Sequence, residues 1–599
     1  MDFKTSINCW VRTGFGGCLL ALLVQVIGVS GASVSVTPSV ISNTYTGYFT
    51  LQVGGLTNGE PVRVENYFDV NQNGVLDGAD MLMESYALTD GQRALIGGVT
   101  NVNVPGDFTG ADGSITSYLQ YLGKRPQDGI GNHLIRVSSP TGRFSPVTST
   151  LQITNAFFAQ SISGVVTCSS TNVPYAVIVI LTAQPNGTGD LVAEVAANSA
   201  GSYQVKLPVG DYQVLAFRPG LVFSAATGPQ VTLTNGATLA LNLALLPATQ
   251  SFAGRVVDSV NTNTPIPGVF LVLESASGFL TVCSSDGNGY FSAPVVPDGW
   301  QVSVDSSALA PLGYIGTQTA PAFDTTGAPT TNALLTLVKG TAMVYGTIRN
   351  STNGPVGGLS LFGNDDTHTL ESTGWSDPAG NYSVVTTAGM WWTGPDQWAL
   401  SASSIVGGTD LRTLSAGQAL RQDLAIVQAT TTIHGTVKDS QGQPVFGIGL
   451  WAATGKNGIN FSSNTQTDSN GGYSLGAFDG TWMVGFQGDN NGGLASLGLQ
   501  APYQNPVVTI PPASPVLNFV LYPIGWPQLD PPQPISPGHV AFAMYGLPGT
   551  NYVVQYSTNI ADPGAWRTLS TFTATNMVST VWDHNATNRY RFYRARFWP

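Results

Sequence analysis

The chain has 599 residues, too many for a single hydrophobic core, because individual domains usually contain roughly 50 to 200 residues. Charged residues make up only 9%, whereas glycine and proline number 71 and 37, and this balance favours turn-rich β-structure over long amphipathic helices. The formal charge is −12 and the lysines and arginines form no cluster, which argues against a nucleic acid partner.

The first 32 residues have the features of a secretory signal peptide. Lys4 and Arg12 precede an apolar run over residues 18–29, and residues 30–32 supply the small side chains that a signal peptidase reads. We therefore expect cleavage after Ala32 and a secreted protein, extracellular or at the cell surface, with no membrane span in the mature chain. The alternative is a retained membrane anchor, for which the apolar run is short, since a span needs about 20 residues.

Removal of the signal leaves two cysteines, Cys168 and Cys283. Two cysteines in so long a chain are not a disulfide framework. A bridge between them would suit an oxidising compartment, but we favour two separately buried thiols because the residues fall in different predicted domains.

Residues 33–157 are predicted to form a β-sandwich with strands near residues 48–53, 62–68 and 133–137. An oxygen-rich loop interrupts this segment. With Gly74 at its sharp turn, the loop places oxygen donors at the spacing that seven-coordinate Ca²⁺ needs. The donors are the side chains of Asp69, Asn71, Asn73, Asp77 and Asp80 and the carbonyl of Val75.

That loop resembles an EF-hand or dockerin calcium loop, including the dockerin habit of aspartate at the twelfth position. A dockerin would carry a second copy about twenty residues further on, and none is found. We predict a single structural Ca²⁺ site, with an unmetallated Asn/Asp/Gly hairpin as the alternative.

The centre of the chain is repetitive. A pattern of Asn or Asp, two residues, Gly, one residue and an aromatic residue occurs four times, 88, 91 and 91 residues apart. Its copies begin at Asn198, Asp286, Asp377 and Asp468. A glycine inside a β-branched run precedes each copy at a matching period. These glycines are Gly164, Gly254, Gly346 and Gly435.

One unit reads as strands separated by Gly- and Pro-containing turns, in which the Asn or Asp side chain caps backbone N–H groups and the aromatic ring enters the core. Residues 198–214 and the three related stretches resemble the carboxypeptidase regulatory-like family, a transthyretin-like or Cna-B-type sandwich. The resemblance covers roughly residues 160–525. It implies accessory domains that stabilise, space or bind, with carbohydrate binding in some relatives.

The predicted fold is therefore all-β, a tandem array of about six Ig-like or transthyretin-like β-sandwich domains. Four regulatory-like repeats follow the signal peptide and the N-terminal sandwich, and a Pro-rich linker with a fibronectin-like β module ends the chain. The predicted segments are 1–32, 33–157, 158–248, 249–340, 341–428, 429–525 and 526–599.

The third repeat departs from the pattern at a turn that contains Trp391, Trp392 and Trp398. Exposed indole rings stack on the C–H faces of sugars, so these residues are the candidate ligand-binding site. The alternative is that they fill sandwich cores. Adjacent Trp391 and Trp392 point to opposite faces if they lie in a strand, which would expose one of them.

Catalytic motifs are scarce. Ser474 lies in a G-x-S-x-G sequence, but a nucleophile elbow needs a strand followed by a helix, and Ser474 falls within a predicted strand. The five histidines show no zinc-ligand spacing beside a third ligand. We predict a secreted, non-enzymatic binding, adhesion or scaffold protein whose partners are a polysaccharide or cell-surface glycan, or other extracellular proteins. The alternative is a polysaccharide-active secreted hydrolase with an unrecognised site.

Overall fold

The computed structural model describes residues 31–184, 187–224, 228–318, 320–396, 400, 405–456, 458–487, 493–511, 515–588 and 590–598. Strands dominate every part of it, so the prediction of an all-β array is confirmed. Residues 1–30, which hold most of the predicted signal peptide, lie outside the described residues.

The N-terminal unit is a sandwich of a three-stranded sheet, β1-β3-β8, and a five-stranded sheet, β2-β10-β9-β4-β5. Alternating apolar side chains such as Leu51 and Val64 fill the space between the sheets. Its elements are β1 (Ser33–Thr37), β2 (Val40–Ser42), β3 (Tyr48–Gly54), β4 (Pro61–Asp69), β5 (Met81–Thr89), β6 (Leu95–Ile96), β7 (Val99–Thr100), β8 (Ile115–Gln120), η1 (Pro126–Asp128), β9 (Gly131–Ser138) and β10 (Val147–Thr154).

The first two repeats follow. Repeat 1 contains β11 (Ser161–Cys168), β12 (Thr171–Asn172), β13 (Val177–Gln184), β14 (Gly187–Ala196), β15 (Ser202–Lys206), β16 (Gly210–Phe217), β17 (Leu221–Ser224), β18 (Gln230–Leu233), β19 (Thr238–Ala240) and β20 (Leu243–Pro247). Repeat 2 contains β21 (Gln250–Asp258), β22 (Phe270–Ser275), β23 (Phe279–Ser284), β24 (Tyr290–Val295), β25 (Gly299–Val304), α1 (Ser306–Leu309), η3 (Ala310–Leu312), β26 (Tyr314–Thr317), β27 (Ala322–Asp324) and β28 (Thr330–Lys339).

Repeat 3 contains β29 (Ala342–Asn350), β30 (Ser360–Asp365), β31 (Leu370–Trp375), β32 (Asn381–Thr386), β33 (Gly389–Pro395), β34 (Ile405–Leu414), β35 (Ala419–Arg421) and β36 (Leu424–Gln428). Repeat 4 contains β37 (Thr431–Asp439), β38 (Gly449–Lys456), β39 (Ile459–Gln466), β40 (Gly472–Ala477), β41 (Gly480–Phe486), α3 (Gly493–Ser496), β42 (Leu499–Gln500), β43 (Val507–Ile510) and β44 (Phe519–Pro523).

All four repeats share one topology. The opening strand pairs antiparallel with the strand that carries the landmark aromatic residue and parallel with the last strand of the repeat. A second sheet covers this one in each repeat. Its strand orders are β14-β13-β16-β18, β23-β22-β25-β27, β31-β30-β33-β34 and β39-β38-β41-β43.

In every repeat the landmark glycine packs against one backbone carbonyl of the same repeat. A Cβ on the landmark glycine would come within 2.1 Å of that oxygen, so only glycine fits. The pairs are Gly164 with Leu241, Gly254 with Ala333, Gly346 with Gln422 and Gly435 with Leu517. In three repeats the landmark tyrosine donates its hydroxyl to the same carbonyl. These bonds join Tyr203 to Leu241, Tyr382 to Gln422 and Tyr473 to Leu517.

Consecutive repeats share β-sheets through their edge strands. Strand β17 of repeat 1 pairs with β23 of repeat 2, β26 of repeat 2 pairs with β31 of repeat 3, and β34 of repeat 3 pairs with β39 of repeat 4. All three pairings are antiparallel. An exposed strand edge carries unpaired N–H and C=O groups, and here part of each edge is paired with the next repeat, over two or three residues of each strand.

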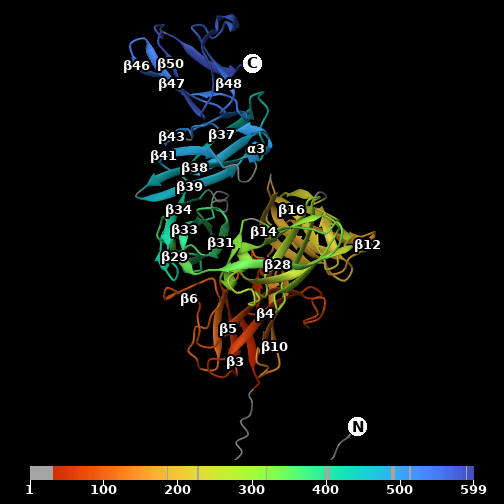
Figure 1. The fold of residues 1–599 in the computed structure, drawn as a ribbon. Coiled ribbons are helices and arrows are strands. Elements are labelled where there is room, and N and C mark those ends of the chain that lie inside the picture. The colour runs from red at the N-terminus through yellow and green to blue at the C-terminus, as the bar shows by residue number, and fades with distance from the viewer. Residues whose placement is uncertain are drawn as a thin grey trace, which may run out of the picture.

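The N-terminal unit contacts three repeats at once. Phe68 and Val70 pack against Val177 of repeat 1 and Phe270 of repeat 2 in one hydrophobic cluster. Asn103 donates its amide to the Ser383 carbonyl of repeat 3 at 2.7 Å. The N-terminal unit and repeats 1–3 therefore form one base, from which repeat 4 and the C-terminal unit project (Figure 1).

The C-terminal unit is a smaller sandwich. The Pro-rich segment 527–534, predicted as a linker, contributes strands to it, and Pro534 lies in an edge strand, where a missing N–H is tolerated. Its elements are β45 (Gln528–Leu529), β46 (Gln533–Ser536), β47 (His539–Tyr545), β48 (Asn551–Ser557), η5 (Pro563–Ala565), β49 (Arg567–Thr573), β50 (Val578–Asp583) and β51 (Phe592–Phe597).

Candidate functional site

A cavity of about 440 Å³ lies where the N-terminal unit meets the first three repeats. Its volume falls in the range of small-molecule pockets. Most of its wall is apolar and consists of strand residues whose side chains line the cavity, including Met83, Val177, Phe217 and Phe270. No single domain forms this cavity, so it exists only in the assembled base.

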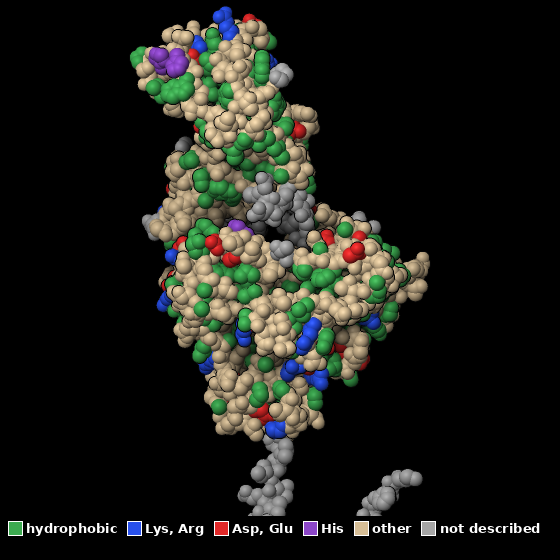
Figure 2. Space-filling model, in the orientation of Figure 1, with side chains coloured by type: hydrophobic (Ala, Val, Ile, Leu, Met, Phe, Trp, Pro, Cys, Tyr) green, Lys and Arg blue, Asp and Glu red, His purple; other side chains and the backbone are tan. Residues whose placement is uncertain are grey.

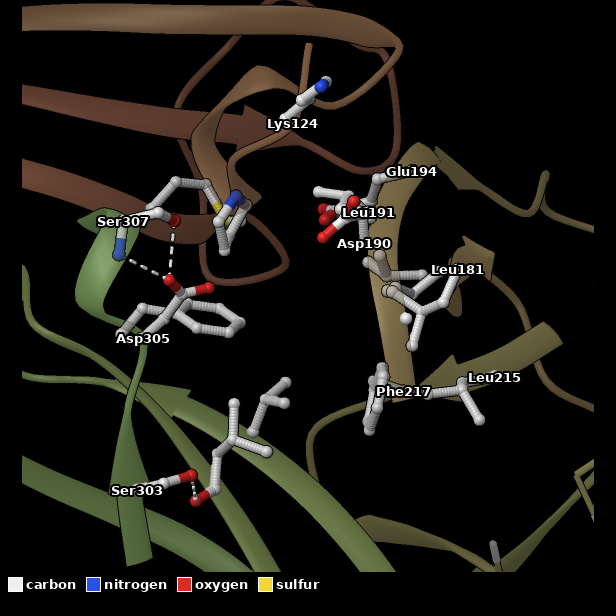
Figure 3. Close-up of a pocket in the computed structure, with 18 of the residues that line it drawn as sticks. Lys124, Leu181, Asp190, Leu191, Glu194, Leu215, Phe217, Ser303, Asp305 and Ser307 are labelled. Atoms are coloured by element: carbon white, nitrogen blue, oxygen red, sulfur yellow. Dashed lines mark hydrogen bonds between the residues drawn. The ribbon is translucent and has the colours of Figure 1, made fainter. Parts of the chain in front are cut away.

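Carboxyl groups face each other across the cavity. Figure 3 shows Asp190 and Glu194 of β14 on one side and Asp305, with Ser307, on the other. Asp305 accepts a hydrogen bond from the Ser307 N–H at 2.8 Å and so caps the short helix α1. Lys124 is the one lysine or arginine among the described lining residues, so acidic groups outnumber basic ones.

Glu194 is the most unusual of these acids. Its side chain is only 3% exposed, and its Oε1 has no hydrogen-bond partner among the described residues. Burial, with a smaller contribution from the Asp128 carboxylate, raises the pKa of Glu194 to about 8. With its pKa raised this far, the protonated form of the carboxyl predominates at pH 7, and that form can donate a hydrogen bond.

His133, in the adjoining N-terminal unit, is buried, and its ring nitrogens lie 3.1 Å from Asn66 Oδ1 and 2.7 Å from the Gly129 carbonyl. Burial lowers the pKa of His133. Since both nitrogens already have partners, His133 holds the fold together and is not placed to activate a nucleophile.

The predicted calcium loop connects β4 and β5. Asp69 accepts N–H bonds from Asn73 and Gly74 at 3.1 and 2.8 Å, so the loop closes over the buried first carboxylate. Asp80 Oδ1 is buried without a partner among the described atoms. Burial, with smaller contributions from the nearby charges of Asp69 and Asp77, raises the pKa of Asp80.

The loop residues fit a calcium ion in donor type and in this clustering of charge. Within the part of the chain that the structure describes, however, no three His, Cys, Asp or Glu side chains form a ready metal cluster. The amides of Asn71 and Asn73 and the Val75 carbonyl would have to complete the ligand set, which the hard Ca²⁺ ion accepts. Calcium binding stays a prediction.

We expect calcium to raise the midpoint of thermal unfolding of the mature chain and a chelator to lower it, because an ion bound only by the folded state stabilises that state. The loop lies beside the hydrophobic cluster that contains Phe68 and Val70. Calcium should therefore also raise the unfolding temperature of the base, to which this cluster belongs. Changing Asp69 and Asp77 to Asn should abolish the difference, and Asp112→Asn, outside the loop, should preserve it. Equal midpoints with calcium and with chelator would contradict the site.

The structure separates the candidate tryptophans. Trp391 of β33 is fully buried in the core of repeat 3. Its ring cannot stack on a sugar, so Trp391 is not part of the candidate ligand-binding site. Trp392 points to the other face, as strand alternation predicts, and is 39% exposed. Trp398 lies outside the described residues.

Sequence reasoning missed the cavity and Glu194. The available signal was an acid inside an otherwise apolar stretch of β14, residues 191–196. Such an acid in a buried strand implies an unusual environment. Cys168 and Cys283 are free thiols in repeats 1 and 2.

Comparisons with known proteins give only weak likenesses. No family model matches the chain, and no curated protein matches it. Similar solved structures include the Bacillus anthracis TIE protein, with 12% identity, 67% of this chain and 75% of that chain covered, and a TM-score of 0.16.

Two pilins are also similar. A streptococcal ancillary pilin has 10% identity, covers 46% of this chain and 98% of its own, and has a TM-score of 0.15. BcpA, the major pilin subunit of Bacillus cereus, has 9% identity, coverages of 45% and 99%, and a TM-score of 0.13. These scores are low, so the likenesses carry no argument about function. Separately, no helix in the described ranges is long and apolar enough to cross a membrane.

Proposed function

We propose that this chain is a secreted, non-enzymatic scaffold or adhesion protein that holds its C-terminal unit at a fixed distance from a rigid base. The observation that supports this most is the sharing of β-sheets between consecutive repeats. Independent domains on short linkers move relative to one another. Edge pairing replaces such hinges with backbone hydrogen bonds at the three junctions between repeats. At the junction with the C-terminal unit, the Tyr503 N–H donates to Gln528 Oε1 at 3.0 Å and the Tyr503 ring stacks on Tyr545.

The exposed surface of the C-terminal unit is better suited to binding a partner than to catalysis. The C-terminal unit carries several exposed aromatic rings, which are typical of recognition surfaces. They are Trp582, Tyr590, Phe592, Phe597 and Trp598. Its proposed partners are other extracellular proteins or a polysaccharide or cell-surface glycan. Turnover of a polysaccharide by the purified mature chain would overturn the non-enzymatic part of the proposal.

Carbohydrate binding is the finer form of this proposal. The exposed ring of Trp392 on repeat 3 and that of Trp582 on the C-terminal unit support it. A flat indole presented to solvent can stack on a sugar ring.

Small-angle X-ray scattering of residues 33–599 tests the rigidity that this function requires. We expect the profile to match the single arrangement in Figure 1, with base and projection in fixed relation. A profile that only an ensemble of independently moving domains reproduces would contradict the proposal.

A further inference from the structure

Two histidines that are 45 residues apart in sequence form a pair on the C-terminal unit. Strands β47 and β50 are antiparallel, with Val540 opposite Asp583. His539 directly precedes Val540 and His584 directly follows Asp583, so the two histidines occupy the next opposed positions of the two strands. Their Nδ1 atoms lie 3.3 Å apart, and Figure 2 shows histidine side chains gathered at one corner of this unit.

The pair lies on the outer face of its sheet. Side chains alternate along β50, so Asp583 is 1% exposed whereas Trp582 is 49% exposed. His584 shares the outer face with Trp582, and their rings stack with centroids 6.0 Å apart and planes 7° apart. On this face His584 is exposed and His539 is partly exposed.

The separation of the two nitrogens suits a metal ion. Zinc binds imidazole nitrogen at about 2.0–2.1 Å in tetrahedral geometry, which places two ligand nitrogens about 3.4 Å apart. Imidazole is a favoured ligand of zinc, copper and nickel. A hydrogen bond between the two Nδ1 atoms gives the same spacing, and a metal ion would displace the proton that they share.

The geometry points to a two-histidine site for a divalent transition-metal ion, formed by Nδ1 of His539 and Nδ1 of His584. Neither residue belongs to the predicted calcium loop. Among the described side chains no third His, Cys, Asp or Glu joins the pair, so water or a group from a contacting molecule would fill the remaining positions. Such an open site binds more weakly than a closed structural zinc site.

The preference among metals should follow ligand chemistry. Copper(II) should bind more tightly than nickel(II) or zinc(II), because affinities of nitrogen ligands peak at copper. Binding should weaken as the pH falls, since protons compete with the metal for the imidazole nitrogens. Millimolar calcium in every titration keeps the oxygen-rich loop of the N-terminal unit from contributing.

The test is a titration of CuCl₂ into the untagged mature chain, followed by quenching of tryptophan fluorescence and by calorimetry. We expect one ion per chain, with quenching that comes from Trp582 because its ring stacks on His584. His539→Ala and His584→Ala should each lower the affinity at least tenfold. Trp582→Phe should remove most of the quenching while calorimetry still reports one ion.

His368→Ala is the matched control, because it removes a histidine from a loop of repeat 3 and should leave the affinity unchanged. Circular dichroism confirms that each variant is folded, which is expected because both paired histidines lie at the surface. Absence of saturable binding, or unchanged affinity after loss of both paired histidines, would overturn the site and leave only a hydrogen bond.

Discussion

Trp391→Ala is expected to destabilise repeat 3 by about 3–5 kcal/mol, as large-to-small changes of fully buried aromatic residues do. The ring is completely enclosed between the two sheets of the repeat. Its removal deletes apolar contacts and leaves a cavity that stiff neighbouring strands cannot close. Calorimetry of the mature chain should show the transition that includes repeat 3 at a markedly lower temperature.

Trp392→Ala is the matched control, because it deletes the same side chain one residue away, on the exposed face. Its effect on stability should be clearly smaller than that of Trp391→Ala, because Trp392 is already 39% exposed to solvent. If repeat 3 binds a glycan, this variant should lose binding to insoluble polysaccharide at temperatures well below its melting. Equal destabilisation by the two substitutions would contradict the assignment of faces.

The stability of the wild-type fold is expected to decrease as the pH rises, and Glu194→Gln is expected to make this decrease smaller. The folded-state pKa is about 8 and the ordinary value is 4.5. Between these values the folded chain keeps a proton that the unfolded chain has lost, so stability falls as the pH rises through this window and stays low above it. Glutamine carries no ionisable proton and removes this contribution.

Thermal midpoints from pH 5 to pH 9 measure the effect. The wild-type midpoint should fall across the range, and Glu194→Gln should melt at a higher temperature than wild type at pH 8 and at a similar one at pH 5. Asp190→Asn, an exposed change on the same strand, should leave the decline as it is. Parallel curves for wild type and Glu194→Gln would show that Glu194 is not the group responsible.

The repeat fold is readable from sequence because its determinants are local. In each Asn- or Asp-x-x-Gly turn the first side chain caps two backbone N–H groups, as Asp468 does for Asn470 and Gly472. The glycine that closes the turn has a positive φ, for example 73° at Gly471. Each feature needs a particular residue type at a fixed spacing, so the four copies stand out.

The way in which the repeats pack against one another could not be predicted from the sequence. Pairing of β26 with β31 uses backbone groups, and any sequence supplies those. The cavity depends on four units meeting, and the histidine pair on a strand register set between residues 45 apart. For Trp391 and Trp392 the alternation was predictable, but the face that would be buried depended on the position of the second sheet.

A designed cross-link tests the shared sheets most directly. Thr317 of repeat 2 and Leu370 of repeat 3 lie directly opposite each other across the antiparallel β26–β31 pair. Opposed residues in such a pair have Cα separations of about 4.5–5.5 Å, within the range that a disulfide spans. Thr317→Cys with Leu370→Cys, in a chain with Cys168 and Cys283 changed to Ala, should oxidise spontaneously when folded.

Thr317→Cys with Glu371→Cys is the control, because Glu371 is one residue out of register and its side chain points to the other face. Thiol titration and mass spectrometry of the oxidised chain give the result. The account predicts nearly complete bridging of Thr317→Cys with Leu370→Cys and little bridging of the control. Equal yields for the two pairs, or no bridge in either, would contradict the claim that neighbouring repeats are joined in one sheet.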